Sequence, residues 1–182
     1  GKKIYKSGGA QAIAARAFGT ETIPRVDKIT GPGNIFVTLA KKEVYGHVDI
    51  DMLAGPSEIL IVADKTADPV YTAADMLSQA EHDPLASSIV ITDDAELAEK
   101  VAKEAEKQLA ALPRREIAQA SIDRNGLIVV ADDMMQAMRF ANVSAPEHME
   151  LLTAQPFQLL PYVRHAGAVF LGAYSAEPLG DY

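Results

Sequence analysis

The sequence predicts an α/β protein with a mostly parallel, doubly wound sheet, the architecture of an incomplete Rossmann-like domain. The first supporting observation is that short runs of apolar and β-branched residues alternate with longer segments that have helical apolar spacing. The second is that several of these short runs are continuously apolar, which is typical of strands buried on both faces. Strands that alternate with helices form βαβ units, so we expect them to lie parallel.

Local signals along the chain support these elements in order. Glycine turns open the first two helices, and Asp83-Pro84 stops the third because proline cannot continue a helix. The segment 94–111 is the clearest helix, with an apolar stripe and Glu–Lys pairs four residues apart. The expected strands are residues 2–7, 25–30, 58–64, 87–93, 126–132 and 167–172, with 149–154 as a further candidate, and the expected helices are residues 9–18, 34–45, 68–81, 94–111, 114–122, 133–142 and 156–164.

Composition limits the function classes that the chain can have. It has 182 residues, and we expect a single α/β domain across residues 1–182. The formal net charge is −8, which argues against nucleic-acid and anionic-membrane partners because both need basic surface. No apolar run approaches the ~20 residues of a membrane-spanning helix. The absence of cysteine excludes disulfides and thiolate metal sites. We expect a cytoplasmic location.

Two glycine turns are candidate binding loops. In a parallel sheet, ligands usually bind at the carboxyl ends of strands, so we expect site residues there. "SGGAQAIAA" (7–15) and "TGPGNIF" (30–36) each place glycine where a helix opens, and free backbone N–H groups at such a turn favour anions. Neither segment matches G-x-G-x-x-G. A glycine turn before a helix is also common without any ligand, and both interpretations stay open at this point.

Three polar segments are candidates for chemistry. "AGPSE" (54–58) precedes an apolar strand and is either a plain turn or a pocket that holds the Ser57 hydroxyl. In "SQAEHD" (78–83), Gln79 and His82 share a helix face, and they are either a solvated helix end or two metal ligands. "SAPEHMEL" (144–151) sets Glu147 beside His148, a workable acid–base pair if the turn brings them together, or a surface turn if it does not.

Six blocks occur in order along the chain: "GGAQAIAA", "GPGN", "DMLAGPSE", "QAEHD", "SAPEHMEL" and "EPLGDY". Together they closely resemble the histidinol dehydrogenases of bacteria, and the resemblance covers essentially the whole chain. It implies a zinc-dependent homodimeric oxidoreductase that converts L-histidinol to L-histidine through histidinal, in the last steps of histidine biosynthesis. Two NAD+ molecules accept the hydrides.

The resemblance also implies roles for individual residues. Gln79, His82 and Asp181 match zinc ligands that also contact the substrate, and Glu147 and His148 match the catalytic acid–base pair, in which His148 also contacts the substrate. Ser57 matches a further substrate contact, and Gln11 and Asn34 match contacts to NAD.

The family's pattern extends beyond this chain. A fourth zinc ligand, a histidine, and a nearby glutamate follow the last block in the family, and a tyrosine that contacts NAD precedes the first. We therefore expect the chain to be the central part of a longer enzyme and to be inactive alone. Two alternatives stay open: an NAD-dependent dehydrogenase of another alcohol or aldehyde on the same scaffold, and a non-catalytic domain that binds a small molecule.

Overall fold

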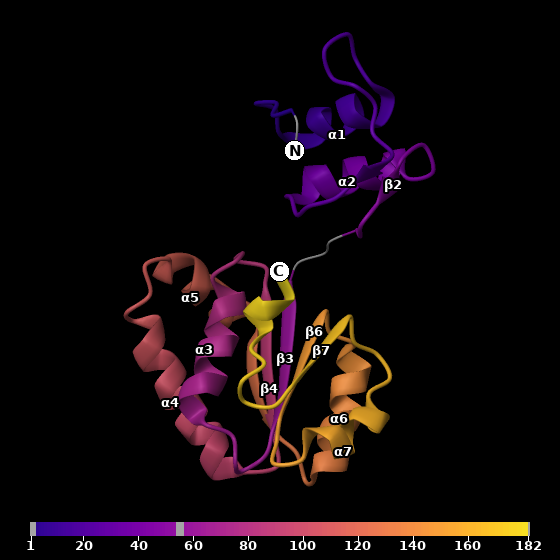
Figure 1. Ribbon diagram of the computed structural model, residues 1–182. Helices are drawn as coiled ribbons and strands as arrows, with labels where there is room; N and C mark the ends of the chain where they lie inside the picture. The colour runs from indigo at the N-terminus through magenta and orange to yellow at the C-terminus, as the bar shows by residue number, and fades with distance from the viewer. Residues whose placement is uncertain (1–2, 54–56, 182) are drawn as a thin grey trace. The chain divides into compact units, whose positions relative to one another are not determined.

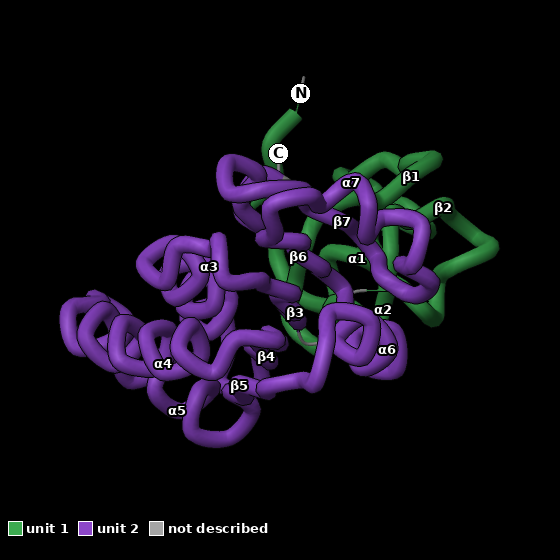
Figure 2. The backbone as a smooth tube through the Cα atoms, turned by 90° about the horizontal axis from the view of Figure 1, so that it is seen from below, with its two compact units in different colours: residues 1–55 green, residues 56–182 purple. Residues whose placement is uncertain are grey.

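The chain forms two compact units, residues 1–55 and residues 56–182 (Figures 1 and 2). The structure is a computed structural model that describes residues 3–53 and 57–181, apart from the side chains of residues 180 and 181. The sequence predicted one domain across residues 1–182. That stays a prediction, because two compact units can belong to one domain of a complete protein.

Unit 1 (residues 1–55) holds two helices that pack against each other and a two-stranded parallel sheet. Its elements are α1 (Gly9–Phe18), β1 (Lys28–Ile29), α2 (Ile35–Val44) and β2 (Asp49–Ile50). Lys28 pairs with Asp49, and Ile29 pairs with Ile50. A small apolar core joins the helices to the strands through Ile13, Ala17, Ile29, Val44 and Val48.

The strands of unit 1 differ from those expected. The described part of the expected strand 2–7 is not a strand, and it leaves Ile4 93% exposed, so this residue has no sheet face on which to pack. The expected strand 25–30 is shortened to β1. The two-residue β2 was not predicted, because two residues are too few for a periodic signal.

Unit 2 (residues 56–182) is built on a five-stranded parallel sheet in the order β5-β4-β3-β6-β7. Its elements are β3 (Glu58–Ala63), α3 (Pro69–Ala80), β4 (Ser87–Thr92), α4 (Ala95–Leu109), α5 (Arg115–Asn125), β5 (Gly126–Val130), α6 (Met134–Ser144), β6 (His148–Leu152), α7 (Pro156–Leu159), the 3₁₀ turn η1 (Leu160–Tyr162), β7 (Ala168–Leu171) and the 3₁₀ turn η2 (Glu177–Asp181). These elements confirm the predicted α/β class and parallel sheet.

Helices cover both faces of this sheet, as doubly wound topology requires. α3, α4 and α5 lie on one face, and α6 and α7 lie on the other (Figure 1). Asp68, Asp94 and Asp133 each begin a helix by accepting a hydrogen bond from a backbone N–H two or three residues on, which satisfies one donor of the first turn. Because the strands are parallel, the chain returns to the same end of the sheet before each strand begins.

The strands divide their side chains between two apolar cores. On β3, Leu60 and Val62 pack in the core under α6, whereas Ile59 and Ile61 pack in the core under α3 and α4. Strand β6 follows the same alternation, since side chains along a strand point to opposite faces in turn. Its Met149 and Leu151 belong to the α6 core, and Leu152 belongs to the α3 core, which places the side chain of His148 on the α3 face.

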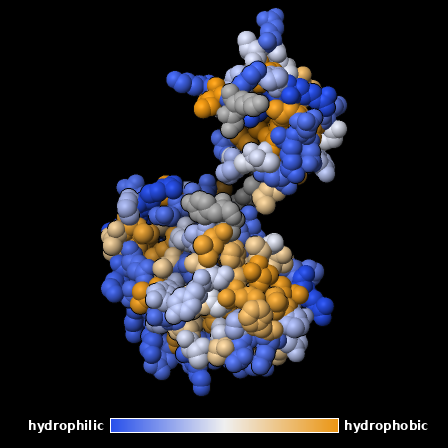
Figure 3. All heavy atoms as spheres, viewed as in Figure 1, coloured by the Kyte–Doolittle hydropathy of each residue, from blue (hydrophilic) through white to orange (hydrophobic). Residues whose placement is uncertain are grey.

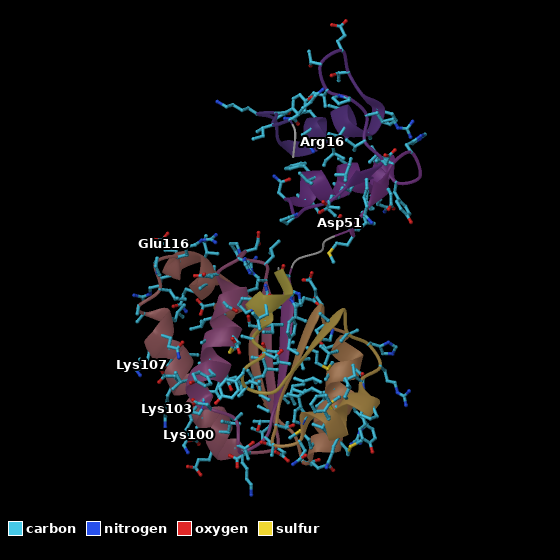
Figure 4. All side chains as sticks on the ribbon, viewed as in Figure 1. Arg16, Asp51, Lys100, Lys103, Lys107 and Glu116 are labelled. Atoms are coloured by element: carbon cyan, nitrogen blue, oxygen red, sulfur yellow. The ribbon has the colours of Figure 1, made fainter. Side chains whose placement is uncertain are left out.

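The outer face of α4 is charged, as predicted. Lys100 pairs with Glu96 at 2.7 Å, and Lys103 lies 3.8 Å from Glu99. Lys100, Lys103 and Lys107 project away from the sheet (Figure 4). Pairs this exposed contribute little to stability, so we assign this face no chemistry. Within the described ranges, every helix is too short or too polar to cross a lipid bilayer.

Candidate active site

Four predicted site residues lie at the end of the unit 2 sheet where its strands begin. Ser57 directly precedes β3, Glu147 directly precedes β6, His148 is the first residue of β6, and Gln79 lies in the last turn of α3. α3 runs back from the end of β3, so its last turn returns to the edge where β4 begins. These residues therefore do not lie at the carboxyl ends of the strands, where we expected them. The expectation assumed loops that follow strands, whereas these residues lie in segments that lead into strands.

The imidazole of His148 lies against two hydrogen-bond acceptors. Its Nδ1 atom is 3.3 Å from Gln79 Oε1 and 3.6 Å from Glu177 Oε1. The side chain of His148 is 15% exposed, and its ring packs at an angle against Phe170 of β7, with ring centroids 5.9 Å apart. Acceptors beside Nδ1 favour the tautomer that carries its proton there. The lone pair then lies on Nε2, where the imidazole can act as a base.

A cluster of buried acids surrounds this contact, and the sequence analysis did not include it. Glu177 and Glu150 are almost completely buried. The backbone N–H of Glu177 donates to Glu150 Oε1 at 2.8 Å, and Ser78 Oγ lies 3.3 Å from Glu177 Oε2. Asp75 of α3 lies beside Glu150. The cluster thus links α3, β6 and the first residue of η2.

Burial raises the pKa of Glu150 to about 9, with the negative charge of Asp75 as the next contribution. Burial also raises the pKa of Asp75, despite its hydrogen bond with Glu150, and the charge of Glu177 adds to this increase. Glu150 is therefore protonated and neutral near pH 7. A neutral acid can accept a hydrogen bond at one oxygen and still share its proton at the other.

The side chains of Glu147 and His148 do not form a hydrogen bond with each other. Glu147 precedes β6, and its Oε2 atom is buried with no hydrogen-bond partner among the described residues. Its carbonyl oxygen accepts from Ala168 N–H at 2.8 Å, and Gly167 packs directly over that oxygen. A buried carboxyl oxygen without a partner is costly unless water or a ligand satisfies it, which makes Glu147 a candidate functional group.

The other predicted residues of unit 2 are less enclosed. Ser57 is half-buried, and its carbonyl oxygen accepts from Ser87 N–H at 3.1 Å. His82 is exposed in the turn that follows α3, with its N–H donating to the carbonyl of Gln79 at 3.2 Å. Asp181 belongs to η2, but its side chain lies outside what the structure describes.

The described residues supply only part of a metal site. Where side chains are described, no three His, Cys, Asp or Glu residues gather closely enough to hold a metal ion. Gln79 offers a buried amide oxygen, and His82 offers an exposed imidazole from the next turn. The imidazole is an ordinary donor for zinc, but two donors fall short of the three or four that zinc sites need.

The two residues predicted to contact NAD lie in unit 1, at the starts of its helices. Asn34 begins α2, and its Oδ1 atom accepts from Val37 N–H at 3.2 Å. Gln11 is exposed in the first turn of α1, and its amide folds over Gly9, which has a φ of +71°. A Cβ atom at position 9 would lie 3.0 Å from Gln11 Oε1, which is tighter than an ordinary contact, so glycine suits this turn.

A buried lysine holds the loop before α2. Lys41 donates to the Gly31 carbonyl at 2.5 Å and to Asp51 at 2.6 Å, while Gly31 N–H donates to the other Asp51 oxygen at 2.7 Å. Although burial works against its charged form, these hydrogen bonds and one from Met52 N–H hold the pKa of Asp51 well below its ordinary value. The interaction fixes the "TGPGN" loop to Asp51, the residue that follows β2.

Unit 2 is therefore a parallel α/β structure that gathers an imidazole, an amide and buried carboxyl groups at one edge of its sheet, as in α/β enzymes with acid–base sites. The chain belongs to the histidinol dehydrogenase family, whose sequence pattern matches residues 1–182. This confirms the family that the six sequence blocks indicated.

Named relatives agree with this assignment. The chain is 64% identical over 180 residues to the histidinol dehydrogenase of Bacillus licheniformis and 62% identical over 181 residues to that of Bacillus subtilis. These matches include 99% and 100% of this chain. The chain spans only 42% of the length of each relative.

Solved structures give the same result. The crystal structure of histidinol dehydrogenase from Elizabethkingia anophelis matches with a TM-score of 0.93 and 45% identity, over 100% of this chain and 42% of that one. A γ-glutamyl phosphate reductase from Thermotoga maritima matches with a TM-score of 0.53 and 13% identity, over 90% of this chain and 44% of that one. The second likeness concerns the fold alone.

Proposed function

We propose that the complete protein to which this chain belongs oxidises L-histidinol to L-histidine through histidinal, as a cytoplasmic homodimer that uses NAD+. Family membership supports the enzyme class. The observation that carries the chemistry is the contact of His148 Nδ1 with Gln79 and Glu177, because it leaves Nε2 of a largely buried imidazole as a base.

In the first oxidation, His148 takes the proton of the carbinol O–H through Nε2. The oxygen forms a C=O double bond as the C–H electron pair leaves with the hydrogen as hydride for NAD+, which gives histidinal and NADH. A positioned base of this kind typically contributes 10²–10⁴-fold to a rate.

The second oxidation needs a water, and Glu147 is placed to hold one. Its buried Oε2 atom has no partner in the described part of the chain, and a water there would satisfy it. Glu147 takes a proton from this water as the oxygen attacks the aldehyde carbon, and the former carbonyl oxygen takes the proton that His148 received in the first oxidation, which gives a gem-diol. His148, neutral again, then removes a hydroxyl proton while hydride leaves for a second NAD+. The product is the carboxylic acid of histidine, which loses its remaining proton to solvent.

The remaining predicted residues would bind rather than react. Zinc, held by Gln79, His82 and Asp181, would supply a fixed positive charge that grips the nitrogen atoms of histidinol. Ser57 would contact the substrate, and Gln11 and Asn34 would contact NAD. The nature of the donors supports this part of the proposal: amide, imidazole and carboxylate oxygens or nitrogens, with no thiolate.

The test uses the full-length protein and single-turnover formation of NADH, started separately from histidinol and from histidinal. Glu147→Gln should spare the first oxidation and slow the second by about 10²–10⁴-fold, whereas His148→Asn should slow both. Glu116→Gln, on the outer surface of α5, is the matched control (Figure 4). Equal loss on both substrates in Glu147→Gln would remove its assigned role. A wild-type protein that reduces NAD+ with another alcohol but not with histidinol would overturn the proposed substrate.

A further inference from the structure

We propose that Glu177 is a positioning residue for His148: the buried Glu177 Oε1 atom, 3.6 Å from Nδ1, favours the tautomer with its proton on Nδ1 and thereby keeps the lone pair on Nε2. The inference rests on the proposed function, in which His148 is the base. It gives a role to a residue that had none among the sequence predictions, although it opens the block "EPLGDY", about thirty residues after His148.

The contact geometry distinguishes Glu177 from Gln79. Both place an oxygen near Nδ1, at 3.6 Å and 3.3 Å. An amide can rotate to present its NH₂ group instead, whereas a carboxyl group has no N–H group to present. In the proposed function, Gln79 Oε1 also serves as a ligand, whereas Glu177 Oε1 lies against His148 without that second task.

The surroundings of Glu177 hold it in this position. Its backbone N–H is fixed by Glu150 Oε1 at 2.8 Å, and its second carboxyl oxygen lies 3.3 Å from Ser78 Oγ. Glu150 and His148 are two residues apart on β6, so both side chains point to the same face of the sheet. The strand therefore sets the spacing between the base and the group that anchors its partner.

The protonation of Glu150 suits this arrangement. A second ionised carboxylate beside Glu177 would repel it and would compete for the charge on a protonated imidazole. Burial raises the pKa of Glu150 to about 9, so it anchors Glu177 without adding a negative charge. Of the carboxyl groups in the cluster, Glu177 is the one that lies against Nδ1.

A double-mutant cycle in the full-length protein tests the proposal. Glu177→Gln should lower kcat for histidinol oxidation roughly 10–100-fold and leave KM within about twofold, because partners behind a functional group have effects of this size. The same change in a His148→Asn background should cost nothing further, since Glu177 acts through that ring. Glu116→Gln is again the control. An equal loss in both backgrounds, or no loss in either, would overturn the proposal.

A second measurement does not depend on activity. The ¹⁵N shifts of the His148 ring, assigned by comparison with His148→Asn, should report a proton on Nδ1 in the wild type and a mixture of tautomers in Glu177→Gln. Unchanged shifts would contradict the positioning role, even if the protein oxidised no histidinol and the proposed function failed. Should glutamine at 177 prevent folding, Glu177→Asp takes its place in the cycle, because it keeps the charge but shortens its reach to Nδ1, and the same non-additivity is expected.

Discussion

Glu150 is a carboxyl group that the fold keeps protonated. It is 0% exposed, and its Oε2 atom has no hydrogen-bond partner among the described residues apart from the proton-sharing neighbour Asp75. The folded protein therefore holds a proton at Glu150 over a range of pH in which the unfolded chain releases it. The range extends from the ordinary value of 4.5 to about 9.

The stability of the Glu150→Gln variant relative to the wild type should increase as pH rises. A raised pKa gives a contribution that is complete below pH 4.5 and is lost as pH approaches about 9. Glutamine keeps the acceptor for Glu177 N–H and cannot ionise, so the unfolding free energy of the variant minus that of the wild type should increase from pH 5 to pH 9. Urea unfolding at three pH values measures this difference. A difference that stays constant, as expected for the exposed control Glu116→Gln, would show that Glu150 is not held neutral.

Individual site residues were predictable to different degrees. His148 and Gln79 were found because they lie in sequence blocks with a known order, and their contact at 3.3 Å joins residues 69 positions apart. Glu150 has a local signal, an acid within an apolar strand, from which a role could have been predicted. Glu177 lies in the last block, "EPLGDY", but no role could be predicted for it, because its contact with His148 depends on how the segment after β7 returns to the start of β6.

At the scale of elements, the predicted helices and the central strands agree with the structure because their periodic signals are long. β3, β4, β5, β6 and β7 each lie within two residues of the expected bounds. The expected helix 156–164 is instead α7 followed by the 3₁₀ turn η1, since Pro161 removes a backbone donor from the second turn. The short pair β1–β2 could not be predicted in full, because tertiary pairing rather than local pattern defines it.

Gly167 lets β7 approach the start of β6 closely. A Cβ at this position would lie 2.6 Å from the Glu147 carbonyl oxygen, a distance that the backbone cannot accommodate without a shift. Gly167→Ala should therefore destabilise the protein by about 1–3 kcal/mol. Gly8→Ala is the control, because nothing lies within 4 Å of a Cβ there. Thermal unfolding of the two variants compares them, and equal melting temperatures would contradict the close approach.

Lys41 should be the main polar support of unit 1. Lys41→Met removes hydrogen bonds to Gly31 and Asp51 and leaves the half-buried carboxylate without its ammonium partner. We expect a loss of about 2 kcal/mol, less than for a fully buried pair because Asp51 keeps some solvent contact. Hydrogen exchange should accelerate across β1, α2 and β2 and stay unchanged in unit 2. Lys28→Met, which removes an exposed pair with Asp49, should have little effect, and a similar effect of both variants would contradict the prediction.

At the scale of the whole molecule, unit 2 exposes much apolar surface. Apolar side chains gather over the part that holds α6 and α7 (Figure 3), where Phe157 is 74% exposed. On the same helix-covered face, an open groove between α6 and the β4–β5 side of the sheet is lined by Leu127, Val129, Phe140 and Val143. Monomeric proteins rarely leave large apolar patches uncovered.

The isolated 182-residue chain should therefore self-associate. We expect its apparent mass in sedimentation to rise with concentration. Val143→Lys should reduce this association, because Val143 is 86% exposed and lies on the groove. The control Lys100→Met, on the charged face of α4, should leave it unchanged. A monomer at all concentrations, or an equal effect of both variants, would show that the groove does not drive association.

The alternation along β6 also constrains how this protein can evolve. Met149 and Leu151 face one core while His148, Glu150 and Leu152 face the other. Deletion or insertion of one residue before Met149 would shift the register of β6 by one residue. The imidazole would then face the α6 core, and the Met149 side chain would face Gln79 in its place. Lineages can therefore exchange amino acids in this strand one at a time, but they can alter chain length only outside it, for example in residues 110–114 between α4 and α5.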